Sequence, residues 1–491
     1  MLIAVVAAGL ALRLFDLGGE SLWLDEGVAI RIASLPLAET VTATAADVHP
    51  PLYRSLLHGW IRVFGRSETA ARLLSALLGG LAVWLAAVVG MRVCGAFAGL
   101  AGAALLAVSP LAIRYAQDAT SYSLFLCLAL VSQLLFLRWL EARRLAVGLA
   151  YAVATAALLY AHNAAAFVVA AQWITVLVAL PRAPAPPAEF FLRWVFLQIS
   201  VAALYLPWIT VLLGQLGHVR GDFWIPVPTA RTLGGTLLDF AGSPWMFGAL
   251  GIACAAGALT RHVETEPTGA WPSPRAVLLP WALVPIAGPF VASYLVAPIF
   301  LTRITLPALP AVLLIAGRGV AQLRGTGVRA AVTAALLLGM AFPLLSNYRE
   351  PNKERWREAA ADLDAWASPG DLLLVHAGYC KEEILDYYLR RRDLEVVPFP
   401  AHHVAVAESD TTELESWIAG RRRVWLVQSH SGDGQGLIRK TLAAALPHVT
   451  ERDYPQVGYR WSPGPPYVGV ALWRYETGDS ARAQAPGESR R

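Results

Sequence analysis

Long apolar segments separated by short polar intervals occupy residues 1–346. A helix needs roughly 20 apolar residues to cross the hydrocarbon core of a bilayer, and about eleven segments approach that length. They lie near residues 1–17, 70–90, 95–113, 121–140, 145–161, 164–181, 194–213, 246–260, 276–297, 304–317 and 330–346. The pattern predicts a polytopic α-helical membrane protein with about eleven transmembrane helices.

The hydrophobic pattern changes after Ser346. Residues 356–366 have apolar positions at helical spacing, and residues 371–375 and 424–427 are short apolar runs typical of buried strands. Roughly half of the chain's charges fall in its last ~145 residues. We therefore divide the chain into a transmembrane domain, a small soluble α/β domain outside the membrane and a disordered polar tail, at residues 1–346, 347–477 and 478–491.

Composition agrees with a membrane protein. The chain is 56% hydrophobic and 15% charged, and its mean hydropathy is +0.50, whereas a soluble domain carries about 25% charged residues. A net charge of +5 could indicate nucleic-acid binding. The arginines, however, lie in short clusters between apolar segments, as membrane topology requires. Membrane lipids are therefore expected partners, and nucleic acid is not.

The arginine clusters also predict the orientation of the chain. They fall in alternate loops, at Arg92, at Arg143 and Arg144, at Arg182 and Arg193, at Arg261 and Arg275, and at Arg318, Arg324 and Arg329. Cytoplasmic loops are enriched in Lys and Arg, so we expect these loops to face the cytosol. Residues 18–69, 114–120, 162–163, 214–245 and 298–303 then face outward, in what we expect to be a bacterial inner membrane.

The first outer loop, residues 18–69, contains the adjacent carboxylates Asp25 and Glu26 and a histidine, His49, before two prolines. Carboxylates near a membrane surface can accept a proton or hold a cation, although Asp25 could instead cap a helix. Prolines have a fixed φ and restrict the preceding residue. His49 could thus contact an acceptor, a phosphate or a metal, or simply precede a helix. Residues 50–64 have the spacing of an amphipathic interfacial helix.

Three later outer loops also contain polar residues beside apolar segments. Arg114 to Asp118 lie in a loop of a few residues, which favours a buried or cavity-lining cluster over ordinary interfacial anchoring. His162 interrupts an apolar stretch, where turn formation is the alternative explanation. Arg303 on the outer side runs against the charge rule, so we expect an anionic partner, either a specific ligand or lipid head groups.

These strings together resemble the GT-C glycosyltransferases that use polyprenyl-phosphate sugars, a superfamily that includes the protein O-mannosyltransferases and the lipid A aminoarabinose transferase (glycosyltransferase family 39 type). The resemblance covers about residues 10–345. It is carried by Leu22-Trp23-Leu24-Asp25-Glu26, His49-Pro50-Pro51-Leu52-Tyr53, Glu68 to Arg72 with Ser75, Ser109-Pro110 with Arg114 to Asp118 and Tyr122-Ser123, Tyr160 to His162, and Arg303. Their order, with all of them predicted on one side of the membrane, makes the resemblance specific.

The resemblance implies a GT-C fold and a role for each matching residue. Asp25 corresponds to the acidic residue proposed as catalytic base, Glu26 is its neighbour, and Asp118 matches the second acidic position. His49, Tyr53, Arg72, Arg114, Tyr122, His162 and Arg303 are the expected donor- or acceptor-binding residues. Arg303 stands where the family is thought to hold the donor phosphate, but Ile304 follows it where the family usually has tyrosine.

The expected function is therefore inverting transfer of a sugar from a polyprenyl-phosphate donor to a lipid, glycan or protein acceptor outside the cytosol. A polytopic transporter or flippase is the main alternative, but it predicts symmetric halves and charges near mid-membrane. A membrane-anchored sensor and a ligase using pyrophosphate-linked glycans also stay open. A divalent cation is an open question, since Asp25, Glu26, Asp118 and His49 could bind Mg²⁺ or Mn²⁺, whereas the branches that the chain resembles are thought not to need metal.

Overall fold

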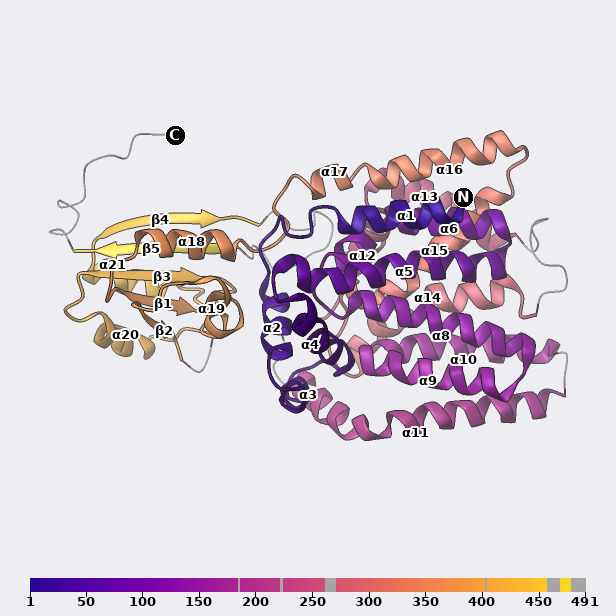
Figure 1. Ribbon diagram of the computed structural model, residues 1–491, viewed down its shortest axis with the longest axis horizontal. Coiled ribbons are helices and arrows are strands. Elements are labelled where there is room, and N and C mark those ends of the chain that lie inside the picture. The colour runs from indigo at the N-terminus through magenta and orange to yellow at the C-terminus, as the bar shows by residue number, and fades with distance from the viewer. Residues whose placement is uncertain (184–185, 221–223, 261–270, 402–403, 457–468, 478–491) are drawn as a thin grey trace. The chain divides into compact units, whose positions relative to one another are not determined.

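The computed structural model describes residues 1–183, 186–220, 224–260, 271–401, 404–456 and 469–477 (Figure 1). The chain divides into two compact units. The helical unit comprises Met1–Leu17 and Ile32–Tyr348, and the α/β unit comprises Gly18–Arg31 and the described part of the chain after Tyr348. The tail predicted at 478–491 lies outside the described residues.

The helical unit is built from helices that lie side by side, as Figure 1 shows for α5, α8 and α9. In chain order its elements are α1 (Leu2–Leu14), α3 (Leu37–Ala46), α4 (Leu52–Phe64), α5 (Glu68–Cys94), α6 (Ala96–Val108), α7 (Pro110–Ala116), α8 (Tyr122–Ala142), α9 (Leu145–Ala161), α10 (Ala165–Ala179), η1 (Leu180–Arg182), α11 (Pro187–Arg220), α12 (Ala230–Ala241), α13 (Pro244–Leu259), α14 (Pro274–Leu295), η2 (Thr302–Ala308), α15 (Leu309–Ala321), α16 (Thr326–Ala341) and α17 (Leu344–Asn347). Helix α2 (Leu24–Ala33) begins in the α/β unit.

Seven helices of the described chain are long and apolar enough to cross a membrane, and two bent helix pairs bring the total to nine if each pair is one span. Two shorter apolar helices, α1 and α9, complete the set. All eleven segments predicted from the sequence fall on these helices or pairs. The protein is thus an integral membrane protein with a polytopic helical fold. By length and composition alone, seven to nine spans qualify among the described residues, and the shorter α1 and α9 account for the remainder of the eleven predicted segments.

Both bent pairs have an identifiable local cause. Helices α6 and α7 meet at 59° where Pro110 removes a backbone donor, and the Ser109 hydroxyl caps α7 by accepting the Ala112 N–H. Helices α12 and α13 meet at 83°, after Gly242 adopts a left-handed φ of 79° that other residues rarely reach. These breaks end α6 and α12 within the helical unit, and Arg114 and Asp239 lie near the C-terminal ends of α7 and α12.

Helix α4 confirms the helix predicted over residues 50–64, but two of its polar residues are buried. Arg54 and His58 are buried, whereas Leu56, Val63 and Phe64 are exposed. His58 Nδ1 lies 2.9 Å from the Ala33 carbonyl, and Arg54 pairs with Asp47. Arg54 and His58 thus have polar partners within the helical unit, while apolar side chains of α4 face outward.

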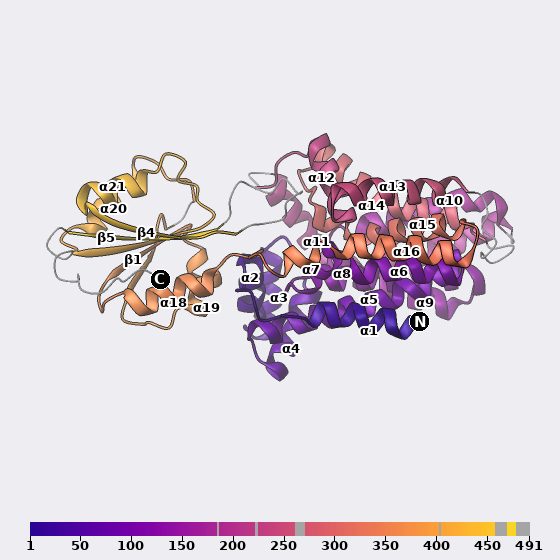
Figure 2. The ribbon, with the colours of Figure 1, turned by 90° about the horizontal axis from the view of Figure 1, so that it is seen from above.

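The α/β unit contains a five-stranded sheet of order β2-β1-β3-β5-β4. Its strands are β1 (Leu372–His376), β2 (Glu395–Pro398), β3 (Arg423–Gln428), β4 (His448–Tyr454) and β5 (Val470–Glu476), and its helices are α18 (Trp356–Trp366), η3 (Lys381–Leu385), α19 (Asp386–Tyr388), α20 (Asp410–Ile418) and α21 (Leu437–Ala445). Strand β1 is parallel to β2 and β3, and β5 is antiparallel to β3 and β4. Figure 2 shows α20 and α21 on one face of the sheet and α18 on the other.

The burial of each element explains whether it could be predicted from the sequence. Central strands β1 and β3 are covered on both faces and therefore form continuous apolar runs. The predicted helix at 356–366 coincides with α18, and both predicted strands lie on β1 and β3. Strand β4 was missed because nearly all of its residues are exposed at the sheet edge and several are charged.

Candidate functional site

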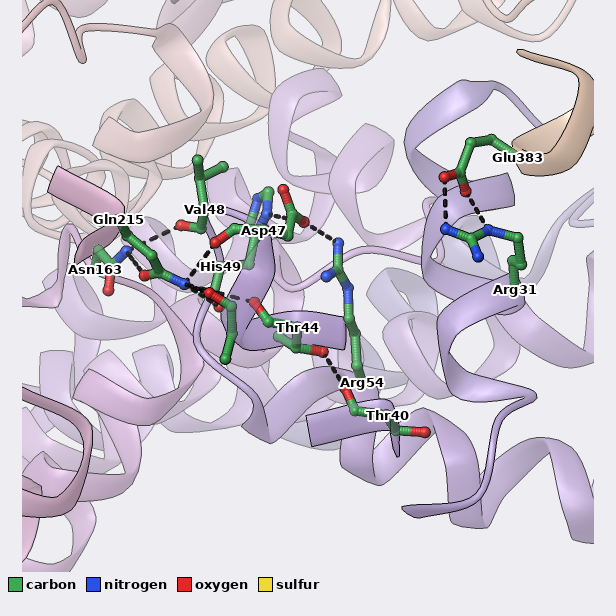
Figure 3. A network of polar contacts seen from close by, with 11 residues as sticks. Arg31, Thr40, Thr44, Asp47, Val48, His49, Arg54, Asn163, Gln215 and Glu383 are labelled. Atoms are coloured by element: carbon green, nitrogen blue, oxygen red, sulfur yellow. Dashed lines mark hydrogen bonds and ion pairs between the residues drawn. The ribbon is translucent and has the colours of Figure 1, made fainter. Parts of the chain in front are cut away.

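The segment between α3 and α4 is organised by Asp47 (Figure 3). Asp47 Oδ2 accepts a hydrogen bond from Arg54 Nη2 at 2.5 Å and lies 3.1 Å from His49 Nδ1. Burial alone would raise the pKa of Asp47, but the His49 hydrogen bond and the charges of His49 and Arg54 hold it well below its usual range. Because Nδ1 of His49 contacts Asp47, Nε2 is the ring nitrogen directed to any ligand.

Two amides hold the backbone around His49 (Figure 3). Gln215 Nε2, on α11, donates to the carbonyls of Asp47 and His49 at 2.6 and 3.2 Å. Asn163 Nδ2 donates to the Val48 carbonyl at 3.0 Å. These contacts join segments more than a hundred residues apart and hold the backbone on either side of His49 in place.

His162 lies in an aromatic cluster beside His49. Its ring stacks on Phe125 at 4.6 Å between centroids and lies 5.6 Å from Tyr122 and 6.4 Å from His49. Burial, with the nearby positive charges of His49 and Arg303, lowers the pKa of His162 to about 3. Its Nδ1 accepts the Ala164 N–H, so the neutral ring carries its proton on Nε2 and can donate one hydrogen bond.

Arg303, in η2, lies between two aromatic rings. Its guanidinium carbon is 5.6 Å from the ring centroid of Tyr122 and 5.6 Å from that of Trp224. Rings on a guanidinium restrict its plane without neutralising its charge. A guanidinium fork beside aromatic rings is suited to binding an anion with several oxygen atoms.

A second group of charges surrounds Tyr115, at the end of α7. The Tyr115 ring lies 4.9 Å from that of Tyr122 and has Arg114 over it at 5.4 Å. Four charged side chains lie near enough to Tyr115 to act on its hydroxyl electrostatically. They are Arg114, Arg303, Asp118 and Asp239. Asp118 and Asp239 are both buried. Asp239 was missed in the sequence, where the only signal was one acid inside an otherwise apolar segment.

Tyr53 and Arg72, two of the predicted binding residues, are buried and link elements of the helical unit. The Tyr53 hydroxyl lies 2.9 Å from Ser75 Oγ. The Ser75 hydroxyl in turn donates to the Thr120 carbonyl at 3.4 Å. Arg72 Nη1 donates to the Leu17 carbonyl at 2.8 Å. Tyr53 therefore supports, through Ser75, the loop that ends at Tyr122, whereas Arg72 holds the chain that follows α1. Direct contact of either residue with a ligand stays a prediction.

Asp25 and Glu26 belong to the α/β unit, in the first turn of α2. Helix α2 begins at Leu24, so Asp25 lies inside the first turn and not at the N-cap position that the capping alternative requires. Negative charge in a first turn is favoured by the helix dipole. Glu26 is fully buried, and its Oε2 lies 3.2 Å from Lys353 Nζ and accepts the Trp23 N–H at 3.4 Å.

Glu354 completes the surroundings of this turn and was not predicted from the sequence. Its Oε2 accepts the Leu24 N–H at 3.3 Å and the Trp356 indole N–H at 2.6 Å. Its Oε1 lies 2.7 Å from His430 Nε2. Burial opposes the charge of His430, but the hydrogen bond and charge of Glu354, with the charge of Asp25, outweigh it and raise the pKa of His430.

The predicted site residues thus fall into two groups. The helical unit brings together His49, Tyr122, His162 and Arg303, with Arg114 and Asp118 near Tyr115. The α/β unit contains Asp25 and Glu26. Within the described residues, no three His, Cys, Asp or Glu side chains are grouped so that they could hold a metal ion.

Residues 48–210 match the family described as dolichyl-phosphate-mannose-protein mannosyltransferase, and this range includes His49, Asp118, Tyr122 and His162. Among curated protein sequences, none matches the chain.

Solved structures resemble the chain over nearly its whole length. ArnT from Cupriavidus metallidurans in the apo state is 16% identical, with a TM-score of 0.60 and 99% of each chain covered. The same protein bound to undecaprenyl phosphate is 15% identical, with a TM-score of 0.59 and coverage of 96% of this chain and 97% of that one. The Archaeoglobus fulgidus oligosaccharyltransferase is 13% identical, with a TM-score of 0.52 and coverage of 87% and 69%. The expected resemblance and the GT-C fold are therefore confirmed.

Proposed function

We propose that this chain, which has a GT-C fold, is a membrane glycosyltransferase that moves a sugar from a polyprenyl-phosphate donor to an acceptor outside the cytosol. The main support is the cluster of His49, Tyr122, His162 and Arg303 within a GT-C fold. All of these residues except Arg303 lie in the segment that matches the mannosyltransferase family. The undecaprenyl phosphate bound to the ArnT structure supports a polyprenyl phosphate as the lipid part of the donor.

In the proposed reaction, an acceptor hydroxyl or amine attacks the anomeric carbon of the donor sugar. The new bond from that atom to the anomeric carbon forms while the bond from the anomeric carbon to the phosphate oxygen breaks. Polyprenyl phosphate leaves with the electron pair, and the acceptor proton passes to the Asp25 carboxylate. A single displacement inverts the configuration of the anomeric carbon. General base catalysis of this kind typically contributes 10²–10⁴-fold.

Arg303 is the proposed partner of the donor phosphate. Its guanidinium lies beside the rings of Tyr122 and Trp224, and a planar fork matches phosphate oxygens directionally. His49, oriented by Asp47 through Nδ1, offers Nε2 to the same donor. Both groups stabilise charge that grows on the phosphate as it leaves.

Asp118 and Asp239 add negative charge near Arg114. We assign Asp118 to the acceptor side of the reaction, where a carboxylate can orient a hydroxyl or an amine. Glu26 is buried and ion-paired with Lys353, so we assign it to supporting Asp25. Neither assignment requires a metal ion.

The arginine distribution supports an active site on the extracytoplasmic side of a bacterial inner membrane. The proposed partners are a polyprenyl-phosphate sugar, a lipid, glycan or protein acceptor, and the surrounding membrane lipids. A pentose and a hexose fit the proposal equally.

A transfer assay tests the proposal. Membranes containing the overproduced protein receive polyprenyl-phosphate sugars labelled in the sugar, and the labelled product is isolated and identified. We expect label in a new glycosidic linkage of inverted configuration, formed far more slowly by membranes containing Asp25→Asn. Label that crosses the membrane still attached to its lipid would instead establish the transporter alternative.

A further inference from the structure

The segment Gly18–Arg31 is bound closely by the α/β unit. The Leu22 N–H donates to the Tyr388 hydroxyl at 2.7 Å, and the Arg357 N–H donates to Ser21 Oγ at 3.1 Å. At the other end of the segment, Arg31 forms a two-point ion pair with Glu383, with both contacts at 2.6 Å (Figure 3). The segment that carries Asp25 is therefore fixed on both sides of the carboxylate.

Between these ends, α2 packs closely on the α/β unit at Gly27. Gly27 lies so close to the backbone carbonyl of Glu383 that a Cβ atom at position 27 would overlap with it. Glu383 belongs to η3, which follows β1. The first two turns of α2 therefore lie directly on the chain that leaves this strand.

The contact lies at an edge of the α/β sheet that is functionally important in many open α/β folds. Strands β2 and β3 lie on opposite sides of β1, so the direction of strand order reverses between β1 and β3. In open α/β sheets, ligands bind outside the carboxyl ends of the strands at such a reversal. Glu383 follows β1 and His430 follows β3, and here this edge of the sheet is occupied by the chain's own Asp25 segment.

Charged groups surround the carboxylate there in a connected set. Glu354 accepts the Leu24 N–H, directly before Asp25, and is itself held by Trp356 and His430. Lys353 pairs with Glu26, directly after Asp25. The charge of Asp25 acts on Tyr379 and on His430. Both neighbours of Asp25 in the chain are thus anchored by consecutive residues, Lys353 and Glu354.

We propose that Glu354 and Lys353 are positioning residues for Asp25, and that the α/β unit serves the transfer reaction by holding the first turn of α2 in one orientation. This inference rests on the proposed function, because it gives the α/β unit a role only if Asp25 acts as the base. Neither residue contacts the substrate. Their effect on the reaction passes through the carboxylate of Asp25.

A double-mutant cycle tests this dependence. The full-length protein carries Glu354→Gln, Asp25→Asn or both, and its rate is measured with a labelled polyprenyl-phosphate sugar and the acceptor found in the transfer assay. Misplacement of a catalytic group by about 1 Å can cost about 10²-fold. We expect Glu354→Gln alone to lower kcat about 10- to 100-fold while the donor KM stays unchanged. In the Asp25→Asn background, we expect it to cause no further loss.

Controls separate positioning from general damage. Glu395→Gln makes the same chemical change at an exposed ion pair with Arg421 in the same unit, and we expect it to leave the rate unchanged. If Glu354→Gln does not fold, Lys353→Met replaces it and should show the same dependence on Asp25. An equal loss in both backgrounds, or no loss in either, would overturn the positioning role. A fully active Asp25→Asn protein would remove Asp25 from the proposed mechanism, whereas absence of transfer by the unmodified protein would overturn the proposed function itself.

Discussion

His430 Nε2 lies 2.7 Å from Glu354 Oε1, and Glu354 is almost completely buried. The hydrogen bond and the charges of Glu354 and Asp25 raise the pKa of His430 above its ordinary value of 6.5, against the effect of burial. The imidazolium therefore stabilises the folded state fully below the unfolded pKa, and this stabilisation is lost as pH rises through the folded pKa.

We predict that His430→Gln lowers the melting temperature most in acidic solution. A hydrogen bond to a charged group contributes about 1.5–3 kcal/mol, so the difference from the unmodified protein should be clear below about pH 6.5. It should shrink as pH rises past the folded pKa of His430. Thermal unfolding of both proteins from about pH 5 to about pH 9 measures this; a difference that grows with pH would contradict it.

Asp25→Asn removes the proposed base while keeping the size of the side chain. We predict that kcat falls at least about 100-fold, since general base catalysis contributes 10²–10⁴-fold. The melting temperature should change little. Steady-state rates and thermal unfolding of the same preparation separate the two effects. Full activity in this variant would remove Asp25 from the mechanism.

Arg303→Lys keeps a positive charge but loses the planar fork and much of the contact with Tyr122 and Trp224. We predict a donor KM about tenfold higher, because lysine binds phosphate as a point charge. The matched control is Arg329→Lys, since Arg329 also lies over an aromatic ring, that of Phe97, but is absent from the cluster. Equal donor KM values for the two variants would rule out a specific role for Arg303.

Gly27→Ala tests the packing of α2 on η3. The new Cβ would overlap with the Glu383 carbonyl, so we predict displacement of the Asp25 segment and a loss of activity of about 10-fold or more. Gly59→Ala is its control, since Gly59 lies inside α4 with open space at its Cβ position. The control should stabilise the protein by about 0.5–1 kcal/mol and leave the rate unchanged.

Several features of the site could not have been read from the sequence. Asp47 was not predicted, because its sequence neighbourhood shows only that His49 precedes two prolines. Its pairing with Arg54 depends on the turn between α3 and α4. Glu354 and Lys353 lie more than 300 residues from the turn that they hold. Nothing in their local pattern distinguishes them from solvent-exposed charges of the same region.

Sequence alone determined the polytopic helical architecture and the central elements of the α/β unit. The apolar length of a span and the apolar runs of β1 and β3 are local properties of the chain, and local properties can be read in order. Tertiary structure decided which charged groups meet. It assigned Asp25 to the α/β unit, turned Arg54 and His58 of α4 inward, and joined Gln215 to the backbone of His49. Buried polar groups need hydrogen-bond partners, and the fold supplies them from any part of the chain. Such a pairing produces no periodic pattern in the sequence from which it could be predicted.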